Sequence, residues 1–333
     1  MEQFRVGRVP NSASRNEKPD KELSAFSAPS RFAAGRNSGS RPTSFFTRPK
    51  GLDCRYPPLQ FPAMPELPEV ETIVRGLAPL LTGRKVRKLE VFDTKLNLDP
   101  GDLPRNRLIR KIYRHGKEIV LDLSCSGKRS RPLWLCVHLR MTGKLIWTPP
   151  PYSPPDRYLR ARIALDHGDL LFIDTRRFGT MRLLNDLADA FPPGLDPLAP
   201  EFTPATLADL LGESTQAIKP WLLRQDRLLG LGNIYASEIL FAARIAPQKP
   251  AGSLTPDEIR RLHLHTCKIL ERAIKYCGTT FSDFRDERDQ SGRFRRFLKV
   301  YGREGSPCRR CGRPIQRVVQ QGRSTFFCPS CQE

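Results

Sequence analysis

Four cysteines near the C-terminal end of the 333-residue chain place the strongest constraint on its fold. Cys308, Cys311, Cys328 and Cys331 form the pattern C-x2-C-x16-C-x2-C, in which each C-x2-C turn can present two thiolates to one side of an ion. Four sulfur ligands suit a tetrahedral zinc and leave no open position for catalysis. The pattern therefore predicts one structural Zn²⁺ that holds together a segment with too little apolar surface to fold alone.

The charge of the chain favours a polyanionic partner. Its 56 Lys and Arg against 35 Asp and Glu give a formal net charge of +21, and most of this excess lies after residue 63. Such an excess is typical of proteins that bind nucleic acid. No apolar run is long enough to span a bilayer, and the N-terminus lacks the apolar core of a secretory signal. We therefore expect a protein that is neither secreted nor inserted in a membrane.

The character of the sequence changes at Met64. Residues 1–63 mix Ser, Arg, Pro, Gly and Asn without an apolar period, which predicts a disordered extension. From Met64 onward apolar residues recur at helical spacing, and Gly83 is placed to end that helix. A β-rich region follows, which two layers of sheet would cover. The predicted strands are Lys85–Phe92, Leu108–Tyr113, Glu118–Leu123, Leu133–Leu139, Arg160–Asp166 and Leu170–Asp174.

After the Pro-rich link 191–200 the apolar pattern becomes helical. The longest predicted helix has Thr255 as its N-cap and Gly278 as its stop. The last forty or so residues are Arg-rich with interleaved aromatics, and three arginines between the cysteine pairs suit a β-hairpin that faces phosphates. The predicted helices are Pro204–Leu211, Ala217–Leu223, Ile234–Ala243 and Thr255–Tyr276.

Four motifs that occur in one order together resemble a known family. They are "PELPEVET", "DTRRFG", "LGLGNIYASEILF" and "VYGREGSPCRRCG" with its later "GRSTFFCPSC". Over Met64–Gln332 the chain resembles the bacterial formamidopyrimidine-DNA glycosylases. The resemblance implies a bifunctional DNA glycosylase and AP lyase of base excision repair. Its substrates would be oxidised purines, with formamidopyrimidines and 8-oxoguanine foremost.

The resemblance also implies an α+β multidomain fold. A catalytic β-sandwich with a leading helix would occupy residues 64–195, and a helix-two-turn-helix DNA-binding domain residues 196–290. A zinc-finger DNA-binding segment would occupy residues 291–333, and the extension 1–63 would be absent from the active enzyme. This division agrees with the β-rich, helical and cysteine-bearing parts distinguished above.

The opening motif carries the implied catalytic groups. Pro65 would be the mature N-terminus, and its amine would form a Schiff base that leads to β- and δ-elimination. A free end is needed because an internal proline nitrogen is an amide, whereas an α-amino group has a pKa of roughly 7.7 to 8.0. Glu66 would be the general acid and base, Lys117 would assist β-elimination, and Arg323 would bind phosphate and assist δ-elimination. A simpler interpretation is that Glu66 and Glu69 complement a helix N-terminus.

A second implied group of side chains contacts DNA. Three of them, of types that wedge between bases or hydrogen-bond an orphaned base, would fill the space left by the everted nucleotide. Where family members often carry a lysine just before "VYGR", this chain has Gln290, which leaves the preferred lesion open. The implied DNA-binding residues are Met141, Tyr158, Arg176, Phe178, Lys219 and Asn233, of which the first, third and fourth are the void-filling ones.

Two other interpretations remain open. The endonuclease VIII branch acts on oxidised pyrimidines, although "PELPEV" favours the formamidopyrimidine branch. A catalytically silent zinc-ribbon DNA-binding protein would result if Pro65 were never exposed. We expect translation from Met64 or proteolysis to expose it, although the extension could instead be an organellar targeting segment. We further expect a monomer that acts on damaged double-stranded DNA in the cytoplasm of a bacterium, at the nucleoid, without membrane contact.

Overall fold

This computed structural model describes residues 64–99, 101, 106–123, 132–150, 157–187, 191–279 and 292–333. All of them belong to one compact unit that begins at Tyr56. The predicted disordered extension 1–63 and the departure at Gln290 lie outside the described residues. Among the described helices, none has the length and apolar character needed to cross a membrane.

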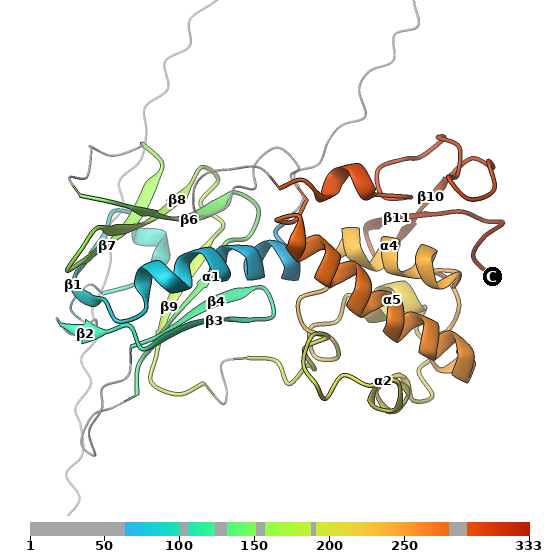
Figure 1. Cartoon of the computed structure of the whole chain (residues 1–333), viewed down its shortest axis with the longest axis horizontal. Helices are drawn as coiled ribbons and strands as arrows, with labels where there is room; N and C mark the ends of the chain where they lie inside the picture. The colour runs from blue at the N-terminus through green and yellow to red at the C-terminus, as the bar shows by residue number, and fades with distance from the viewer. Residues whose placement is uncertain are drawn as a thin grey trace, which may run out of the picture. The chain divides into compact units, whose positions relative to one another are not determined.

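Two antiparallel sheets build the first part of the fold (Figure 1). One has the strand order β2-β1-β7-β8-β6 and the other the order β3-β4-β5-β9. The strands are β1 (Lys85–Val91), β2 (Arg107–Leu108), β3 (Lys111–His115), β4 (Glu118–Asp122), β5 (Trp134–His138), β6 (Gly143–Thr148), β7 (Leu159–Leu165), β8 (Asp169–Asp174) and β9 (Thr180–Leu184). Alternating side chains such as Leu89, Leu121 and Ile163 meet in one buried core between the sheets, which confirms the predicted sandwich.

The predicted strand Leu108–Tyr113 is wrong as a single element. The chain instead leaves one sheet after β2 and enters the other at β3. The buried Ile109 lies at this crossing, where its N–H donates to the carbonyl of Arg84 (2.9 Å) and its carbonyl accepts the N–H of Gly83 (2.8 Å). Sequence analysis also missed β6 and β9, which are short; Gly143 begins β6 and Gly179 directly precedes β9.

Helix α1 (Leu67–Leu81) connects the sandwich to the helical part of the chain. Pro68 occupies its first turn, and Gly83, at φ 84°, follows its end as predicted. Most of its buried face, from Val70 onward, lies in the sandwich core, whereas Leu67 belongs to the helical core. The helix contacts both β3 and the long helix α5 (Pro256–Lys275), so its N-terminus is fixed by two cores (Figure 1).

The helical part has the predicted helices with small changes in their bounds. They are α2 (Pro204–Leu211), α3 (Ile218–Leu222), α4 (Asn233–Ala243) and α5. Thr255 caps α5 as predicted: its hydroxyl accepts the N–H of Glu258 (3.3 Å), whose carboxylate accepts the N–H of Thr255 (2.8 Å). Helices α4 and α5 pack on each other around buried residues that include Trp221, Tyr235 and Leu270.

The C-terminal segment is a short helical turn followed by a hairpin. The turn η4 (Phe294–Phe297) precedes β10 (Gln316–Gln320) and β11 (Arg323–Phe327), which pair antiparallel. Strand β11 contacts α4. A small cluster that includes Phe241, Val300 and Ile315 joins the hairpin segment to α4, so little apolar surface holds this segment.

Candidate active site and DNA interface

Glu66 is the N-cap residue of α1, and its carboxylate also caps a different helix. Its Oε1 accepts the N–H of Ile234 (2.9 Å) and its Oε2 the N–H of Tyr235 (3.3 Å), so it caps the N-terminus of α4 from 168 residues away. Gly232, the N-cap residue, permits this approach because a Cβ there would lie 2.4 Å from the carboxyl carbon of Glu66. Pro65 is buried beside this contact. The simpler interpretation, that Glu66 and Glu69 complement the N-terminus of α1, agrees with the structure: Glu66 is the N-cap residue of α1, and Glu69 in the first turn accepts its N–H. The contact of Glu66 with α4 comes in addition.

The environment of Glu66 brings its ionisation to neutral pH. The side chain is only 3% exposed, and burial raises its pKa to about 7. The positive charge of Lys117 and the two α4 N–H groups oppose this rise, while the carboxylate of Glu69 adds to it. A carboxyl group with this pKa can both donate and accept a proton near pH 7.

Glu69 forms a second buried carboxylate site beside Glu66. Its Oε2 accepts the N–H of Glu66 (3.1 Å). Its Oε1 accepts the hydroxyl of Tyr235 (2.7 Å) and both the N–H (2.7 Å) and hydroxyl (2.9 Å) of Thr279. Burial raises its pKa despite these bonds. Through these bonds Glu69 links the main chain of Glu66 to Tyr235 of α4 and to Thr279, which follows α5.

Lys117 lies on the turn between β3 and β4 rather than within a strand. Burial lowers its pKa, the nearby carboxylate of Glu66 raises it, and the guanidinium of Arg323 lowers it further. These mutual effects show that Lys117 lies among Glu66, Glu69 and Arg323 in space, although they come from three different parts of the sequence. Glu66, Lys117 and Arg323, which the resemblance implies as catalytic groups, are therefore neighbours.

Lys219 and Asn233 extend this cluster toward the β10–β11 hairpin. The Lys219 ammonium donates to the side-chain carbonyl of Asn233 and to the main-chain carbonyl of Ser324 (3.3 Å). Lys219 is fully buried, and burial, with the charge of Arg323, lowers its pKa to about 8. Asn233 is the first residue of α4, where helix N–H groups favour an anion. Arg323 begins β11 and is exposed, which leaves its guanidinium accessible.

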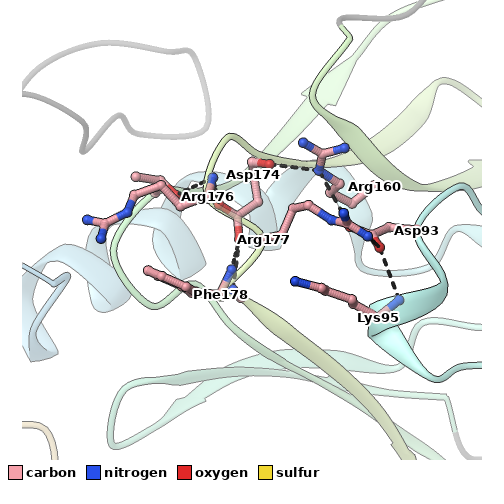
Figure 2. Close-up of polar contacts among 9 residues, drawn as sticks. Asp93, Lys95, Arg160, Asp174, Arg176, Arg177 and Phe178 are labelled. Carbon is pink, nitrogen blue, oxygen red and sulfur yellow. Dashed lines mark hydrogen bonds and ion pairs between the residues drawn. The ribbon is translucent and has the colours of Figure 1, made fainter. Parts of the chain in front are cut away.

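The loop after β8 arranges the three side chains implied to fill the DNA. One carboxylate, that of Asp174, accepts the N–H of Arg176 (3.1 Å), Phe178 (2.9 Å) and Gly179 (2.7 Å), as Figure 2 shows for the first two. The Arg176 guanidinium lies over the Phe178 ring at 4.7 Å and donates to the Met141 sulfur at 3.5 Å. Phe178 is 50% exposed. The three side chains thus form one surface group.

Arg177, in the same loop, points away from that group. It adopts a left-handed backbone conformation (φ 59°), and its guanidinium forms a two-pronged ion pair with Asp93 (2.6 and 2.5 Å). Asp93 also caps a short turn, η1 (Thr94–Leu96), by accepting the N–H of Lys95 (3.0 Å; Figure 2). Because Arg177 is held against Asp93 on one side of the loop, Arg176 and Phe178 project from the other side.

The four predicted zinc ligands come together in the C-terminal segment. Their sulfur atoms all lie within 4.8 Å of one another, and the Cys311 and Cys328 sulfurs are 3.5 Å apart. Tetrahedral ligands at the usual Zn–S distance of about 2.3 Å lie roughly 3.8 Å apart, so the four thiols fit this ion. Four sulfur ligands fill its coordination, which makes the site structural. It holds the β10–β11 hairpin, and with it Arg323, against α4.

Comparison with known proteins identifies the three parts of the chain. Residues 64–181 match the formamidopyrimidine-DNA glycosylase N-terminal domain, residues 194–285 its H2TH domain, and residues 305–333 the zinc finger found in FPG and IleRS. A formamidopyrimidine-DNA glycosylase of Symbiobacterium thermophilum is 42% identical over 280 residues, which cover 81% of this chain and 89% of the relative. The chain belongs to the formamidopyrimidine-DNA glycosylase family.

Solved structures of formamidopyrimidine-DNA glycosylases (Fpg) have the same fold. The MutM (Fpg) protein of Thermus thermophilus is 37% identical, with a TM-score of 0.70 over 80% of this chain and 98% of that one. Lactococcus lactis Fpg was solved with DNA containing Fapy-dG (33% identical, TM-score 0.69) and with DNA containing an oxidised pyrimidine (32%, 0.70). Each covers 81% of this chain and all of the other. The chain is a DNA glycosylase of base excision repair with AP lyase activity and one structural zinc.

Tyr158, another of the DNA-binding residues implied for this glycosylase, lies directly before the start of β7. The guanidiniums of Arg157 and Arg160 lie over its ring at 4.4 and 5.9 Å. Its main-chain carbonyl accepts the N–H of Asp174 (3.0 Å), which places it next to the loop after β8.

Sequence analysis of this glycosylase missed the residues that position the site. Asp93 was not singled out, Asp174 and Gly232 lie inside quoted motifs but received no role of their own, and Glu69 was treated only as a helix-terminal charge. For Asp174 a signal existed, because it is the acid that ends the buried strand "DLLFID" and opens the motif "DTRRFG". Asp93 pairs with a residue 84 positions away, and Gly232 contacts one 166 positions away, which no local pattern reveals.

Proposed function

We propose that Pro65, once it is the N-terminal residue, is the nucleophile with which this glycosylase excises oxidised purines. One observation carries the proposal. The carboxyl group of Glu66, the next residue, is held at the N-terminus of α4 with its pKa raised to about 7. A proton donor and acceptor suited to neutral pH therefore lies directly beside the nitrogen in question. The match to the family's N-terminal domain also begins at residue 64.

The proposed reaction starts with attack of the Pro65 nitrogen on C1′ of the damaged nucleotide. The glycosidic bond breaks and the base leaves with a proton. The nitrogen loses its proton, the C1′–O4′ bond of the sugar ring breaks and O4′ takes up a proton, which leaves the nitrogen and C1′ joined as a cationic Schiff base. Glu66 supplies and removes protons in these steps. Lys117 lies close enough to Glu66 that each of the two groups shifts the pKa of the other. Both side chains can therefore act at the same sugar.

The Schiff base then promotes strand cleavage. Its positive charge acidifies the C2′ proton, whose loss expels the 3′ phosphate, and a second elimination expels the 5′ phosphate. Lys117 assists the first step, and Arg323 stabilises phosphate in the second. The exposed position of Arg323 at the start of β11 and its electrostatic effect on Lys117 support this division.

DNA is bound, in this proposal, by two groups of residues. Lys219 and Asn233 contact phosphate near the lesion, where the buried charge of Lys219 favours an anion. Met141, Arg176 and Phe178, with Tyr158 beside them, fill the gap left by the everted base. The exposed Phe178 ring and the adjoining guanidinium suit stacking and hydrogen bonding respectively.

We further propose that the enzyme acts as a monomer on damaged double-stranded DNA in the bacterial cytoplasm. The partner class is supported by the Lactococcus lactis relative, whose structures contain damaged DNA. Because that one protein was solved with Fapy-dG and with an oxidised pyrimidine, binding alone does not separate the two lesion classes. Formamidopyrimidines are proposed as the leading substrate on the strength of family membership.

Borohydride trapping on DNA with a formamidopyrimidine lesion tests the nucleophile. A protein that begins at Pro65 is expected to be captured covalently, because reduction fixes the Schiff base. The full 333-residue chain, left uncleaved, is expected to give no adduct. A matched control carries one serine before Pro65, which turns the nitrogen back into an amide with minimal added bulk. Equal trapping of all three proteins would refute Pro65 as the nucleophile.

A further inference from the structure

A cavity of about 300 Å³ lies along α4 beyond the end that Glu66 caps. Its lining includes Glu238, Phe241 and Ala242 from α4. Phe241 is eight residues beyond Asn233, which corresponds to roughly 12 Å along a helix. Helix α5, η4 and the first C-x2-C turn complete the walls. No residue of the proposed catalytic or DNA-binding groups lines this cavity.

The inner surface of the cavity is apolar and aromatic. Phe241 and Phe294 are each 4% exposed, and the half-buried Phe297 lies beside Phe294 with ring centroids 5.7 Å apart. Ala242 and Ile269 complete this inner surface. Nothing in this group of side chains can hydrogen-bond, so the surface suits an apolar side chain of a ligand rather than the polar edge of a base.

Cationic side chains surround this apolar surface. Lys268, Arg272, Lys299 and Arg310 line the cavity and are exposed. Two of them are held in place by aromatic rings: Arg272 lies 4.1 Å from the centre of the Phe297 ring, and Arg310 lies 4.4 Å from that of Phe241. Guanidiniums held flat on rings keep their N–H edges available for carboxylates.

The acid in the lining, Glu238, does not neutralise these cations. Its carboxylate accepts the main-chain N–H groups of Lys299 (2.8 Å), Val300 (2.9 Å) and Tyr301 (2.8 Å). Within the described part of the chain, no carboxylate lies within ion-pair distance of Lys268, Arg272 or Arg310. The cavity therefore combines an apolar interior with three cations, Lys268, Arg272 and Arg310, that have no ion-pair partner in that part of the chain.

The histidine in the cavity wall reports this positive potential. Burial lowers the pKa of His265, and the charges of Lys268 and Arg310, then Arg261, lower it further. Three cations from two different segments thus act on one imidazole. A ligand that brings carboxylates into the cavity would reverse this effect and raise the pKa of His265.

We propose that this cavity binds an acidic peptide segment of a partner protein, with one apolar side chain inside the cavity and carboxylates on the surrounding cations. A nucleotide fits less well. Phosphate sites commonly use main-chain N–H groups at helix N-termini, whereas the middle and C-terminal parts of α4 and α5 line this cavity. Separate point charges around an apolar centre match carboxylates distributed along a peptide.

Fluorescence anisotropy with a defined probe tests the proposal. The probe is a fluorescein-labelled peptide of four aspartates followed by two phenylalanines, added to the full chain. Arg272→Glu and Lys268→Glu are each expected to weaken binding roughly tenfold or more, because they replace attraction by repulsion. Lys275→Glu is the matched control, since it reverses an exposed charge on the same helix outside the cavity, and it should change affinity less than about threefold.

Two further ligands separate the proposal from general attraction. A peptide of four aspartates and two serines should bind at least about tenfold more weakly, because it leaves the apolar interior empty. A labelled hexathymidylate should not compete at the cavity. Equal losses in Lys275→Glu and Arg272→Glu, equal affinity of the two peptides, or displacement of the probe by hexathymidylate would each overturn the proposal.

A spectroscopic measurement on the unaltered protein removes dependence on the variants. The imidazole proton signals of the five histidines are recorded during a pH titration, and His265→Gln identifies that of His265. The acidic peptide is expected to raise the pKa of His265 and leave those of the other histidines unchanged. An unshifted His265 at a peptide concentration that saturates anisotropy would place binding elsewhere. Base excision on lesion-containing DNA should be the same in Arg272→Glu and Lys275→Glu.

Discussion

Two buried carboxylates, one at the N-terminus of helix α4 and one on the helix itself, differ in whether they can exchange a proton with a reacting group. Glu66 (3% exposed) caps the N-terminus of the helix, and Glu238 (4% exposed) projects from its second half to the main chain at residues 299–301. Burial raises the pKa of both. Only Glu66, however, lies next to Pro65. It also interacts electrostatically with Lys117, whose own pKa is lowered. Burial therefore raises the pKa of both carboxyl groups, and their neighbours decide whether the proton can be used.

The largest test of this difference compares Glu66→Gln with Glu238→Gln. The first change removes the proposed acid and base, and we expect the single-turnover rate of base excision to fall by about 10² to 10⁴-fold. The second places an amide against three N–H donors, which should lower the free energy of unfolding by about 1 to 3 kcal/mol. Both variants are assayed from Pro65 onward, by product formation and by urea unfolding.

The expected pattern is a loss of activity with a retained fold for Glu66→Gln and the opposite for Glu238→Gln. Rates are compared at a temperature where the folded fraction of Glu238→Gln is unchanged. If Glu238→Gln slowed base excision as much as Glu66→Gln under those conditions, the distinction between the two carboxylates would be wrong.

The pH dependence of stability gives the next largest effect. The pKa of Glu66 rises from 4.5 to about 7 on folding, so between these pH values the folded state holds a proton that the unfolded state has released. Raising the pH through this window therefore lowers the free energy of unfolding, by about 3 kcal/mol from this group. Burial shifts the pKa of Glu69 and Glu238 in the same direction.

Urea unfolding near pH 5 and near pH 8 measures this effect. The Glu66→Gln variant should lose about 3 kcal/mol less stability than the unaltered protein over that range, because glutamine does not titrate. Glu71→Gln is the control, since that residue also lies near the N-terminus of α1 but in ion pairs with Arg75 and Arg114. The same pH slope in Glu66→Gln and the unaltered protein would contradict the raised pKa.

The smallest effect concerns the approach of Glu66 to α4. In Gly232→Ala the new Cβ would lie 2.4 Å from the carboxyl carbon of Glu66, so the carboxylate must move. A displacement of about 1 Å is expected to slow base excision by roughly ten- to a hundredfold. The shorter Glu66→Asp leaves room for that Cβ, so Gly232→Ala should slow the Glu66→Asp enzyme much less than it slows the unaltered one. Additive losses would show that Gly232 acts by another route.

Much of the fold was predictable because local patterns specify it. Thr255, Gly83 and the helical apolar periods mark real helix ends and faces, and the cysteine spacing identifies the zinc site. The predictions failed where the chain changes sheets at Ile109 and at the two short strands β6 and β9. In these places long-range pairing, not local preference, determines the structure.

The candidate site shows the same division. Motifs indicated Pro65, Glu66 and the void-filling residues, but their supports are contacts between distant segments. The carboxylate of Glu66 binds residues about 168 positions away, and Asp93 pairs with Arg177 across 84 positions. A sequence without a structure carries no record of such distances. The pKa of Glu66 near 7 was likewise outside its reach, because it depends on burial by α4 and on charge from Lys117.

The ion pair between Asp93 and Arg177 has a consequence for how lesions are found. With Arg177 fixed in a left-handed conformation and three loop N–H groups bound to Asp174, the loop holds the side chains proposed to enter DNA in place before DNA arrives. A rigid wedge does not adapt to the base step it meets. In this proposal the loop distinguishes damaged from undamaged base steps by how easily each step of the duplex opens. Weakly stacked damaged sites are therefore favoured.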